Sequence, residues 1–278
     1  MSNTQSQANP LASIRHIVAV ASGKGGVGKS TTTVNLALAL RDLGWKVGVL
    51  DADIYGPSVP MMLGIDEARP EVVDNKAMRP IEAQGVVALS MGNLVNEKTP
   101  MVWRGPMASG ALLQLLNQTL WPELDCLLID MPPGTGDIQL TLSQKVPLTG
   151  AVVVTTPQDI ALLDAKKGVE MFRKVNVPVL GVVENMATHV CSQCGHEEHI
   201  FGDQGGKRIA EQYQTELLGA LPLDVTIREG GDTGKPVRAQ QPDSIAGQMY
   251  QNIAERLMAA IGSASTQQSQ PTIIVSDD

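Results

Sequence analysis

The sequence is poor in aromatic residues, in cysteine and in long apolar runs. Phe, Trp and Tyr make up 3% of its 278 residues, so the core is expected to be mainly aliphatic. No apolar run approaches the roughly 20 residues of a transmembrane helix, and residues 1–14 lack the basic start and apolar stretch of a signal peptide. Three cysteines cannot all pair within one chain, which indicates a reducing compartment and predicts a cytoplasmic protein.

The chain also lacks an excess of positive charge. It has 21 Lys and Arg against 29 Asp and Glu, which gives a net charge of −8. This balance disfavours a general affinity for nucleic acid or anionic lipid, so we expect neither nucleic acid nor membrane as a partner, although a local basic patch remains compatible with it. The hydrophobic fraction of 43% is typical of a globular protein with a sizeable core.

Short and almost uninterrupted apolar segments recur along the chain. They lie at residues 17–21, 47–50, 86–89, 126–129, 151–154, 179–183 and 217–221. Strands that are apolar on both faces are typical of parallel sheets with helices on each side. Helical spacing predicts helices over residues 29–43, 159–175 and 243–261. The alternation predicts a doubly wound, mostly parallel α/β sheet in one domain, residues 15–261.

Four regions depart from this alternation. Residues 1–14 are predicted to be a disordered lead-in, and residues 64–82 a loop or small hairpin. Residues 185–204 form a long connection, and residues 262–278, which contain no Lys or Arg, are predicted to be a disordered tail. The helix predicted over residues 243–261 precedes this tail, and its inner face is expected to consist of Ile245, Met249, Ile253 and Leu257.

A glycine-rich segment follows the first predicted strand. Residues 23–30 read GKGGVGKS and satisfy the P-loop pattern G-x-x-x-x-G-K-[ST] between a strand and a helix. Backbone N–H groups of such a loop surround phosphate oxygens, and the helix N-terminus adds a favourable dipole. Lys29 is expected to reach the β- and γ-phosphates, and Ser30 to bind Mg²⁺. The predicted nucleotide-binding residues here are Gly23, Lys24, Gly25, Gly26, Val27, Gly28, Lys29, Ser30 and Thr31.

Three aspartates end predicted strands on the edge of the sheet where such folds bind ligands. Asp51 and Asp53 follow the second apolar segment, and Asp130 follows the fourth. We predict that Asp53 orients the attacking water and that Asp51 lies near the Mg²⁺ shell. Asp130 resembles a Walker B aspartate, which holds Mg²⁺ directly or through water.

The P-loop contains a second lysine, Lys24, in KGGVGKS. This resembles the deviant Walker A class, which includes the MinD and ParA partitioning ATPases, the arsenite-pump ATPase and the nitrogenase iron protein. In that class the early lysine reaches across a dimer to phosphate held by the other subunit. The resemblance implies a nucleotide-sandwich homodimer in which Lys24 acts on the phosphate of the other subunit. Lys24 thereby joins Lys29 and Asp53 as the predicted catalytic residues.

Further segments narrow the resemblance. LDADIYGPSVPMMLG, VWRGPMAS, DMPPGTGD, GVVENMA with a following C-x-x-C, and LPLDVTIREGGDTGKPV together resemble the Mrp/ApbC family of iron–sulfur cluster carrier ATPases. The resemblance covers residues 15–261 and implies ATP hydrolysis, a labile 4Fe–4S cluster shared by two subunits, and exchange of that cluster with scaffold and apo-proteins. By motif position, Asn185 is implied to read the adenine base and the segment around Pro222 to close over it. Many bacterial members carry an additional N-terminal domain, whose role is expected to be absent here or supplied by a separate protein.

Residues 186–202 concentrate the metal-binding side chains of the chain. They hold Cys191, Cys194, His189, His196 and His199. Two cysteines are half of a Cys₄ iron–sulfur site, and the dimer implied by Lys24 would supply all four thiolates. The histidines are then expected to be polar neighbours, and the remaining cysteine, Cys126, a small buried hydrophobe.

Other interpretations of this cluster stay open. Cys191, Cys194, His196 and His199 could bind zinc within one chain, although their spacing is tighter than in a zinc finger. A redox-active disulfide pair and an inert loop are further alternatives. The alternative function is a positioning ATPase of the MinD/ParA type with a structural zinc site, but the tail lacks the cations of a membrane-binding helix. A redox reductase like the nitrogenase iron protein would need a more stable cluster than one C-x-x-C on a loop suggests.

Overall fold

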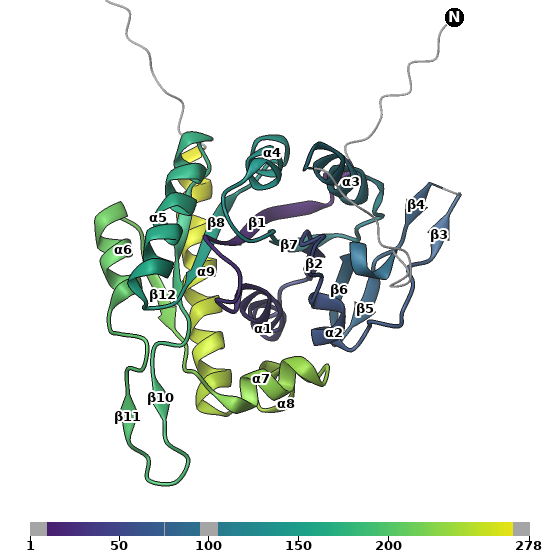
Figure 1. Cartoon of the computed structure of the whole chain (residues 1–278). Helices are drawn as coiled ribbons and strands as arrows, with labels where there is room; N and C mark the ends of the chain where they lie inside the picture. Colours follow the sequence, from purple (N-terminus) through teal and green to yellow (C-terminus); the bar gives the residue numbers. More distant parts are fainter. Residues whose placement is uncertain (1–9, 75, 95–104, 269–278) are drawn as a thin grey trace, which may run out of the picture.

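The computed structural model describes residues 10–74, 76–94 and 105–268. Its centre is an eight-stranded sheet (Figure 1) made of β1 (Ile14–Ser22), β2 (Val47–Asp51), β5 (Ile81–Ala83), β6 (Val86–Ser90), β7 (Leu124–Asp130), β8 (Gly150–Thr155), β9 (Val179–Glu184) and β12 (Leu217–Ala220). The strand order is β12-β9-β8-β1-β7-β2-β6-β5, and all neighbours are parallel except β5 and β6. The predicted doubly wound, mostly parallel α/β sheet is confirmed.

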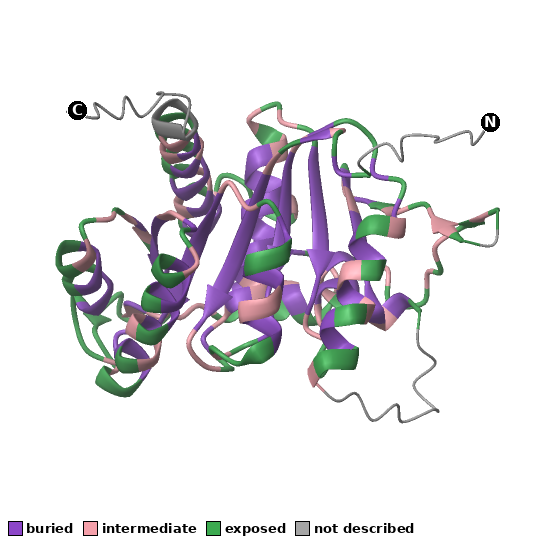
Figure 2. Ribbon diagram, turned by 90° about the horizontal axis from the view of Figure 1, so that it is seen from above, coloured by how far each residue is buried: buried purple, intermediate pink, exposed green. Residues whose placement is uncertain are grey.

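Helices cover both faces of the sheet, so its strands are buried between two layers (Figure 2). One layer contains α1 (Lys29–Asp42), α2 (Val59–Leu63), α7 (Val225–Asp232), α8 (Val237–Gln240) and α9 (Ile245–Gln268). The other contains α3 (Gly105–Gln118), α4 (Asp137–Lys145), α5 (Asp159–Lys174) and α6 (Gly205–Tyr213). Alternate residues of β1 explain the need for two layers, because Val18 and Val20 enter one core while Ile17 and Ala19 enter the other.

Two small hairpins stand outside the central sheet. The first pairs β3 (Val72–Val73) with β4 (Ala77–Met78), which confirms the hairpin anticipated within residues 64–82. The second pairs β10 (His189–Val190) with β11 (Glu197–Glu198), and it lies within the predicted long connection. Among the described helices, none combines the length and the apolar character that crossing a membrane requires.

The last helix differs from its prediction in extent and in face. It continues to Gln268, whereas the sequence pattern places the start of a disordered tail at residue 262. Ile245 is 75% exposed, and Ala246 enters the core in its place. The buried face continues through Tyr250, Ile253, Ala254, Leu257 and Ile261, while Met249 is only partly buried. Residues 1–9 of the predicted lead-in and 269–278 of the predicted tail lie outside the described residues.

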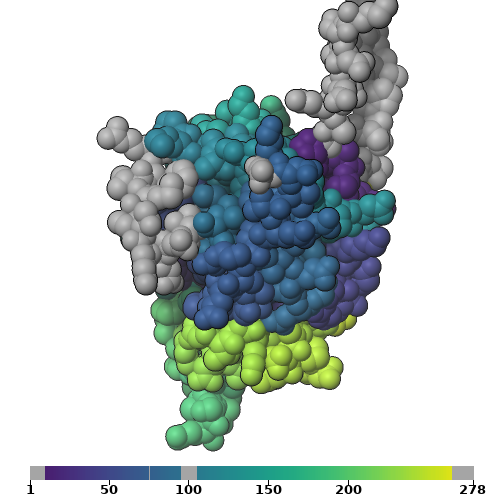
Figure 3. Space-filling model, turned by 90° about the vertical axis from the view of Figure 1, so that its right-hand side faces the viewer, coloured from purple at the N-terminus to yellow at the C-terminus, as the bar shows by residue number. Residues whose placement is uncertain are grey.

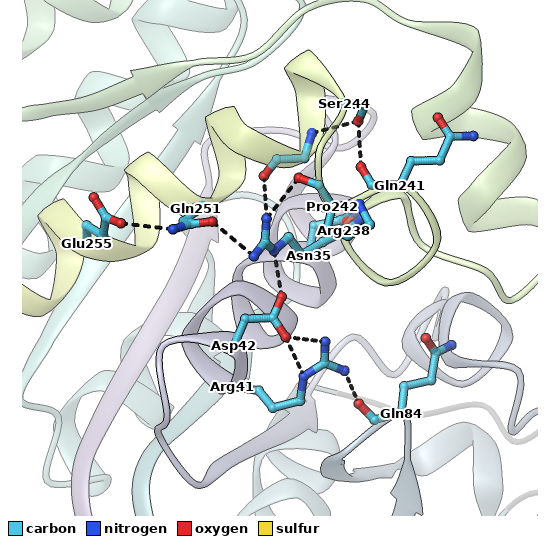
Figure 4. Close-up of polar contacts among 11 residues, drawn as sticks. Asn35, Arg41, Asp42, Gln84, Arg238, Gln241, Pro242, Ser244, Gln251 and Glu255 are labelled. Atoms are coloured by element: carbon cyan, nitrogen blue, oxygen red, sulfur yellow. Dashed lines mark hydrogen bonds and ion pairs between the residues drawn. The ribbon is translucent and has the colours of Figure 1, made fainter.

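A buried arginine fastens the P-loop helix to the C-terminal helices (Figure 4). Arg238 forms an ion pair with Asp42 of α1 at 2.7 Å, and its guanidinium donates to the carbonyls of Pro242 and Gly247, each at 3.1 Å. Its backbone N–H donates to Asn35 Oδ1 at 3.0 Å. These contacts hold α8 and α9 against α1, and sequence patterning alone does not reveal them.

Candidate nucleotide site and cysteine hairpin

The P-loop connects β1 to α1 at the carboxyl edge of the sheet. Two of its glycines are required by close packing. A Cβ on Gly23 would lie 2.1 Å from the carbonyl carbon of Asp164, and one on Gly28 would lie 2.0 Å from Asn185 Nδ2. Gly28 also has φ of 82° and precedes Lys29, the first residue of α1. The loop backbone therefore turns directly into the helix N-terminus, as phosphate binding needs.

Asp130 is the point where the predicted phosphate and metal residues meet. It ends β7, next to β1, and its side chain is fully buried. Lys29 Nζ lies 2.9 Å from Asp130 Oδ2, and Ser30 Oγ donates to the same oxygen at 2.6 Å. Thr33 donates its hydroxyl to Asp130 Oδ1 at 2.8 Å. Sequence reasoning missed Thr33, although it lies three residues after Ser30 and hence on the same face of α1.

The two other aspartates have different surroundings. Asp53 is partly buried, its Oδ2 lies 3.9 Å from Lys29 Nζ, and burial raises its pKa. Asp51 is buried and accepts hydrogen bonds from the N–H groups of Asp53 and Val59 and from the Ser90 hydroxyl. Burial, reinforced by repulsion from Asp130, raises the pKa of Asp51 to about 7. Asp51 thus holds the turn that carries Asp53, and its place near Mg²⁺ stays a prediction.

Of the two residues implied to contact the base, Asn185 lies beside the P-loop and Pro222 lies next to the segment around Asn185. Asn185 follows β9, and its Nδ2 donates to the carbonyl of Val27 at 2.9 Å. Ala187 donates its N–H to the carbonyl of Leu221 at 2.8 Å, so Pro222 lies next to the segment that continues from Asn185. The structure brings these predicted residues together, and their reading of adenine stays a prediction.

The cysteine pair occupies the turn of the hairpin formed by β10 and β11. This hairpin projects from the body of the molecule, below α7 and α8 (Figures 1 and 3). Cys191 donates its N–H to the carbonyl of His196 and accepts at its own carbonyl from Gly195, each at 2.9 Å. Gly195 has φ of +70°, a conformation that glycine adopts readily. The backbone therefore folds tightly around the Cys191–Cys194 turn.

The same turn polarises one of the two thiols. Hydrogen bonds from the backbone N–H groups of Cys194 and Gln193, and from the Cys194 thiol, lower the pKa of Cys191. A lowered pKa favours the thiolate, which is the form that binds metal. Cys126, by contrast, is fully buried in β7, as predicted, and burial raises its pKa.

Two of the three histidines of the hairpin, His189 and His199, contact its base instead of its turn. His199 Nδ1 lies 2.9 Å from the carbonyl oxygen of Ala187, and His189 Nδ1 lies 3.3 Å from that of Leu223. In the described part of the chain, no three His, Cys, Asp or Glu side chains converge as metal ligands. The four-ligand zinc site considered from the sequence is therefore not formed among these residues.

Together, the fold and the P-loop define a P-loop NTPase. The family model described as NUBPL iron-transfer P-loop NTPase, of the ParA group, matches residues 13–258. The chain belongs to this family of iron–sulfur cluster carrier and transfer proteins, which confirms the resemblance seen in the sequence.

Curated relatives support the same assignment. The chain is 64% identical to an iron–sulfur cluster carrier protein of Pseudomonas fragi, over 90% of this chain and 88% of the relative. It is 59% identical to the Escherichia coli protein of that name, over 89% of this chain and 67% of the relative. The mouse iron–sulfur cluster transfer protein NUBPL is 50% identical, over 95% and 83% of the two chains.

Solved structures extend the comparison to the nucleotide. One of them is a nucleotide-binding protein of Archaeoglobus fulgidus in complex with ADP, in which cobalt was found. It aligns with a TM-score of 0.72 at 37% identity, over 81% of this chain and 89% of that chain. The cell division ATPase MinD of Pyrococcus furiosus aligns with a TM-score of 0.64 at 24% identity, over 88% and 99%, and shows the fold alone.

Proposed function

We propose that the chain binds and hydrolyses ATP, holds a labile 4Fe–4S cluster between two copies of itself, and exchanges that cluster with scaffold and apo-proteins. The observation that carries the proposal is the hairpin turn, which presents Cys191 and Cys194 as two thiols without further ligands converging on them in the described chain. Two copies supply the four thiolates that such a cluster takes.

The phosphate site supports the hydrolytic part of the proposal. Ser30 Oγ and Asp130 Oδ2 lie 2.6 Å apart, and such hard oxygen donors fit Mg²⁺. Ser30 and Asp130 would hold the ion, which would supply positive charge next to the phosphates. Lys29 and the P-loop N–H groups then bind the β- and γ-phosphates, and Asp53, whose pKa is raised, orients the attacking water. Lys24 of the second copy completes the charge neutralisation.

Nucleotide and cluster are proposed to influence each other through one segment. The carbonyl of Val27 in the P-loop accepts a hydrogen bond from Asn185. Residues 187–188 lead into the hairpin, and their backbone is hydrogen-bonded to Leu221 and Leu223, on either side of Pro222. A nucleotide that moves this segment also moves the base of the hairpin. Linkage then requires that cluster loading change ATP affinity by the same factor by which ATP changes cluster affinity.

Anaerobic reconstitution with iron and sulfide tests the proposal. The wild-type chain is expected to gain the visible absorption of a 4Fe–4S cluster and to elute as a dimer. Cys191→Ser and Cys194→Ser are each expected to lose the cluster, whereas the buried Cys126→Ala control keeps it. ATP binding by the metal-free chain is expected to be the same in all of them. A cluster that survives both hairpin substitutions, or one tightly bound zinc per chain, would contradict the proposal.

A further inference from the structure

A groove of about 450 Å³ lies outside the nucleotide site and the hairpin, between α4, α5 and α6. Its wall is formed by Lys166, Met171 and Lys174 of α5, Leu140 of α4, Tyr213 of α6 and Thr135 of the loop that follows β7. None of these side chains has a part in the nucleotide chemistry described above. The groove therefore needs its own explanation.

The rim of the groove is strongly basic in an acidic protein. Three cations, Lys166, Lys167 and Lys174, line the groove together with one anion, Glu170, in a chain of net charge −8. Lys167 pairs with Asp164 at 2.9 Å, but no ion pair engages Lys166 or Lys174 among the described residues. Lys174 lies in the last turn of α5, where a cation favours the helix dipole. Lys166 lies in the middle of the helix, where that explanation does not apply.

The floor of the groove is apolar. Met171 is buried, Leu140 is partly buried, and the Tyr213 ring packs under the Arg173 guanidinium at 5.7 Å. The Tyr213 hydroxyl donates a hydrogen bond to Glu170, which is the single carboxylate that lines the groove. Apolar side chains and carboxylates together suit this surface. A nucleic acid backbone suits it poorly, since it has no apolar groups for the floor.

One end of the groove reaches the loop between β7 and α4. Thr135 belongs to residues 131–136, which connect Asp130 to α4. Gly134 in this loop donates its N–H to the carbonyl of Ser22, the last residue of β1 before the P-loop. An occupant that touches Thr135 therefore contacts a segment that follows Asp130 directly and is hydrogen-bonded to the end of β1.

We propose that this groove binds an acidic, partly apolar segment of a protein that exchanges the cluster with this chain. Carboxylates of the segment pair with Lys166 and Lys174, and an apolar side chain enters between Leu140, Met171 and Tyr213. That the partner exchanges clusters rests on the function proposed above, whereas the binding of an acidic segment does not.

Fluorescence anisotropy with the metal-free full-length chain tests the binding. The probe is a labelled synthetic peptide of alternating Asp and Leu, and an Asn/Leu peptide serves as the uncharged comparison. Lys166→Glu combined with Lys174→Glu is expected to weaken binding of the acidic peptide roughly tenfold or more. The matched control combines Lys145→Glu with Lys207→Glu, which makes the same charge change on exposed sites of α4 and α6 that do not line the groove. If the glutamates impair folding, Lys166→Gln with Lys174→Gln replaces them.

Three results would overturn the proposal. The first is equal weakening by the control pair, and the second is equal binding of the Asn/Leu peptide. The third is loss of self-association in the groove variant with peptide binding unchanged, because the groove would then be an interface between copies of this chain. Cluster loading and ATP hydrolysis are measured separately on the same variants, so failure of the carrier function does not affect the peptide result.

Discussion

Replacement of Lys29 by methionine is expected to destabilise the fold as well as to prevent ATP binding. The Lys29 side chain is 6% exposed and the Asp130 side chain 0%, with 2.9 Å between their charged atoms. Removal of one partner from such a buried pair costs about 3–5 kcal/mol, because the other charge stays buried and uncompensated. Since the hydroxyls of Ser30 and Thr33 still donate to Asp130, we expect the lower end, about 3 kcal/mol.

Lys24→Met provides the matched control. Lys24 is only partly buried, and no ion pair engages it within the described part of the chain. Its replacement is therefore expected to change the free energy of unfolding by less than about 0.5 kcal/mol. Urea unfolding without nucleotide, at equal m-values, measures both variants. Coinciding midpoints for the two variants would refute the argument that Lys29 and Asp130 stabilise each other.

The same pair of variants separates binding from catalysis. Lys29→Met is expected to lose ATP affinity in calorimetric titration, because its ammonium no longer reaches the phosphates. Lys24→Met is expected to keep ATP affinity and to lose roughly 10³-fold or more in hydrolysis rate, as removal of a cation supplied in trans does. Hydrolysis by Lys24→Met at the wild-type rate would contradict the role across the dimer.

Three further predictions concern pH, thiol reactivity and packing. The unfolded pKa of Asp is about 4, and the folded pKa of Asp51 is about 7, so the folded state binds more protons than the unfolded state between these pH values. The free energy of unfolding should therefore fall as pH rises through this range, by at most about 4 kcal/mol. An Asp51→Asn variant that keeps this slope in urea titrations would contradict the prediction. Cys191 should be alkylated at lower pH than an ordinary thiol while Cys126 stays unmodified, as followed by mass spectrometry, and a midpoint at or above the ordinary thiol pKa argues against the turn geometry. Arg238→Met should lose about 2–4 kcal/mol of unfolding free energy, whereas the exposed Arg256→Met should lose less than about 1 kcal/mol. Equal losses would contradict the argument that Arg238 holds α8 and α9 against α1.

The sheet and its phosphate residues could be predicted because their signals are local. Both faces of β1 and β7 are covered, so their sequences are continuous apolar runs with few competing interpretations. Asp130 and the P-loop follow adjacent parallel strands, and parallel strands bring their carboxyl ends to one edge. Proximity of Lys29, Ser30 and Asp130 therefore follows from the fold class.

Features that depend on tertiary packing could not be predicted in this way. Ile245 fits a helical stripe as well as Ala246 does, and only the contact of α9 with α1 and α8 decides which one is buried. The bond between Asn185 and Val27 joins residues that no local pattern connects. The histidines look like metal ligands in the sequence, but hairpin pairing turns His199 toward the backbone of residue 187.

The position of the hairpin in the chain topology makes it a separable module. It lies in the crossover that leads from β9 through α6 to the edge strand β12, outside every ladder of the central sheet. Crossovers tolerate insertion and deletion, because loop closure depends only weakly on length. The thiol-bearing turn can therefore lengthen or shorten without changing the strand order of the central sheet. Rewriting about a dozen residues would therefore suffice to change the metal-binding character of this P-loop NTPase.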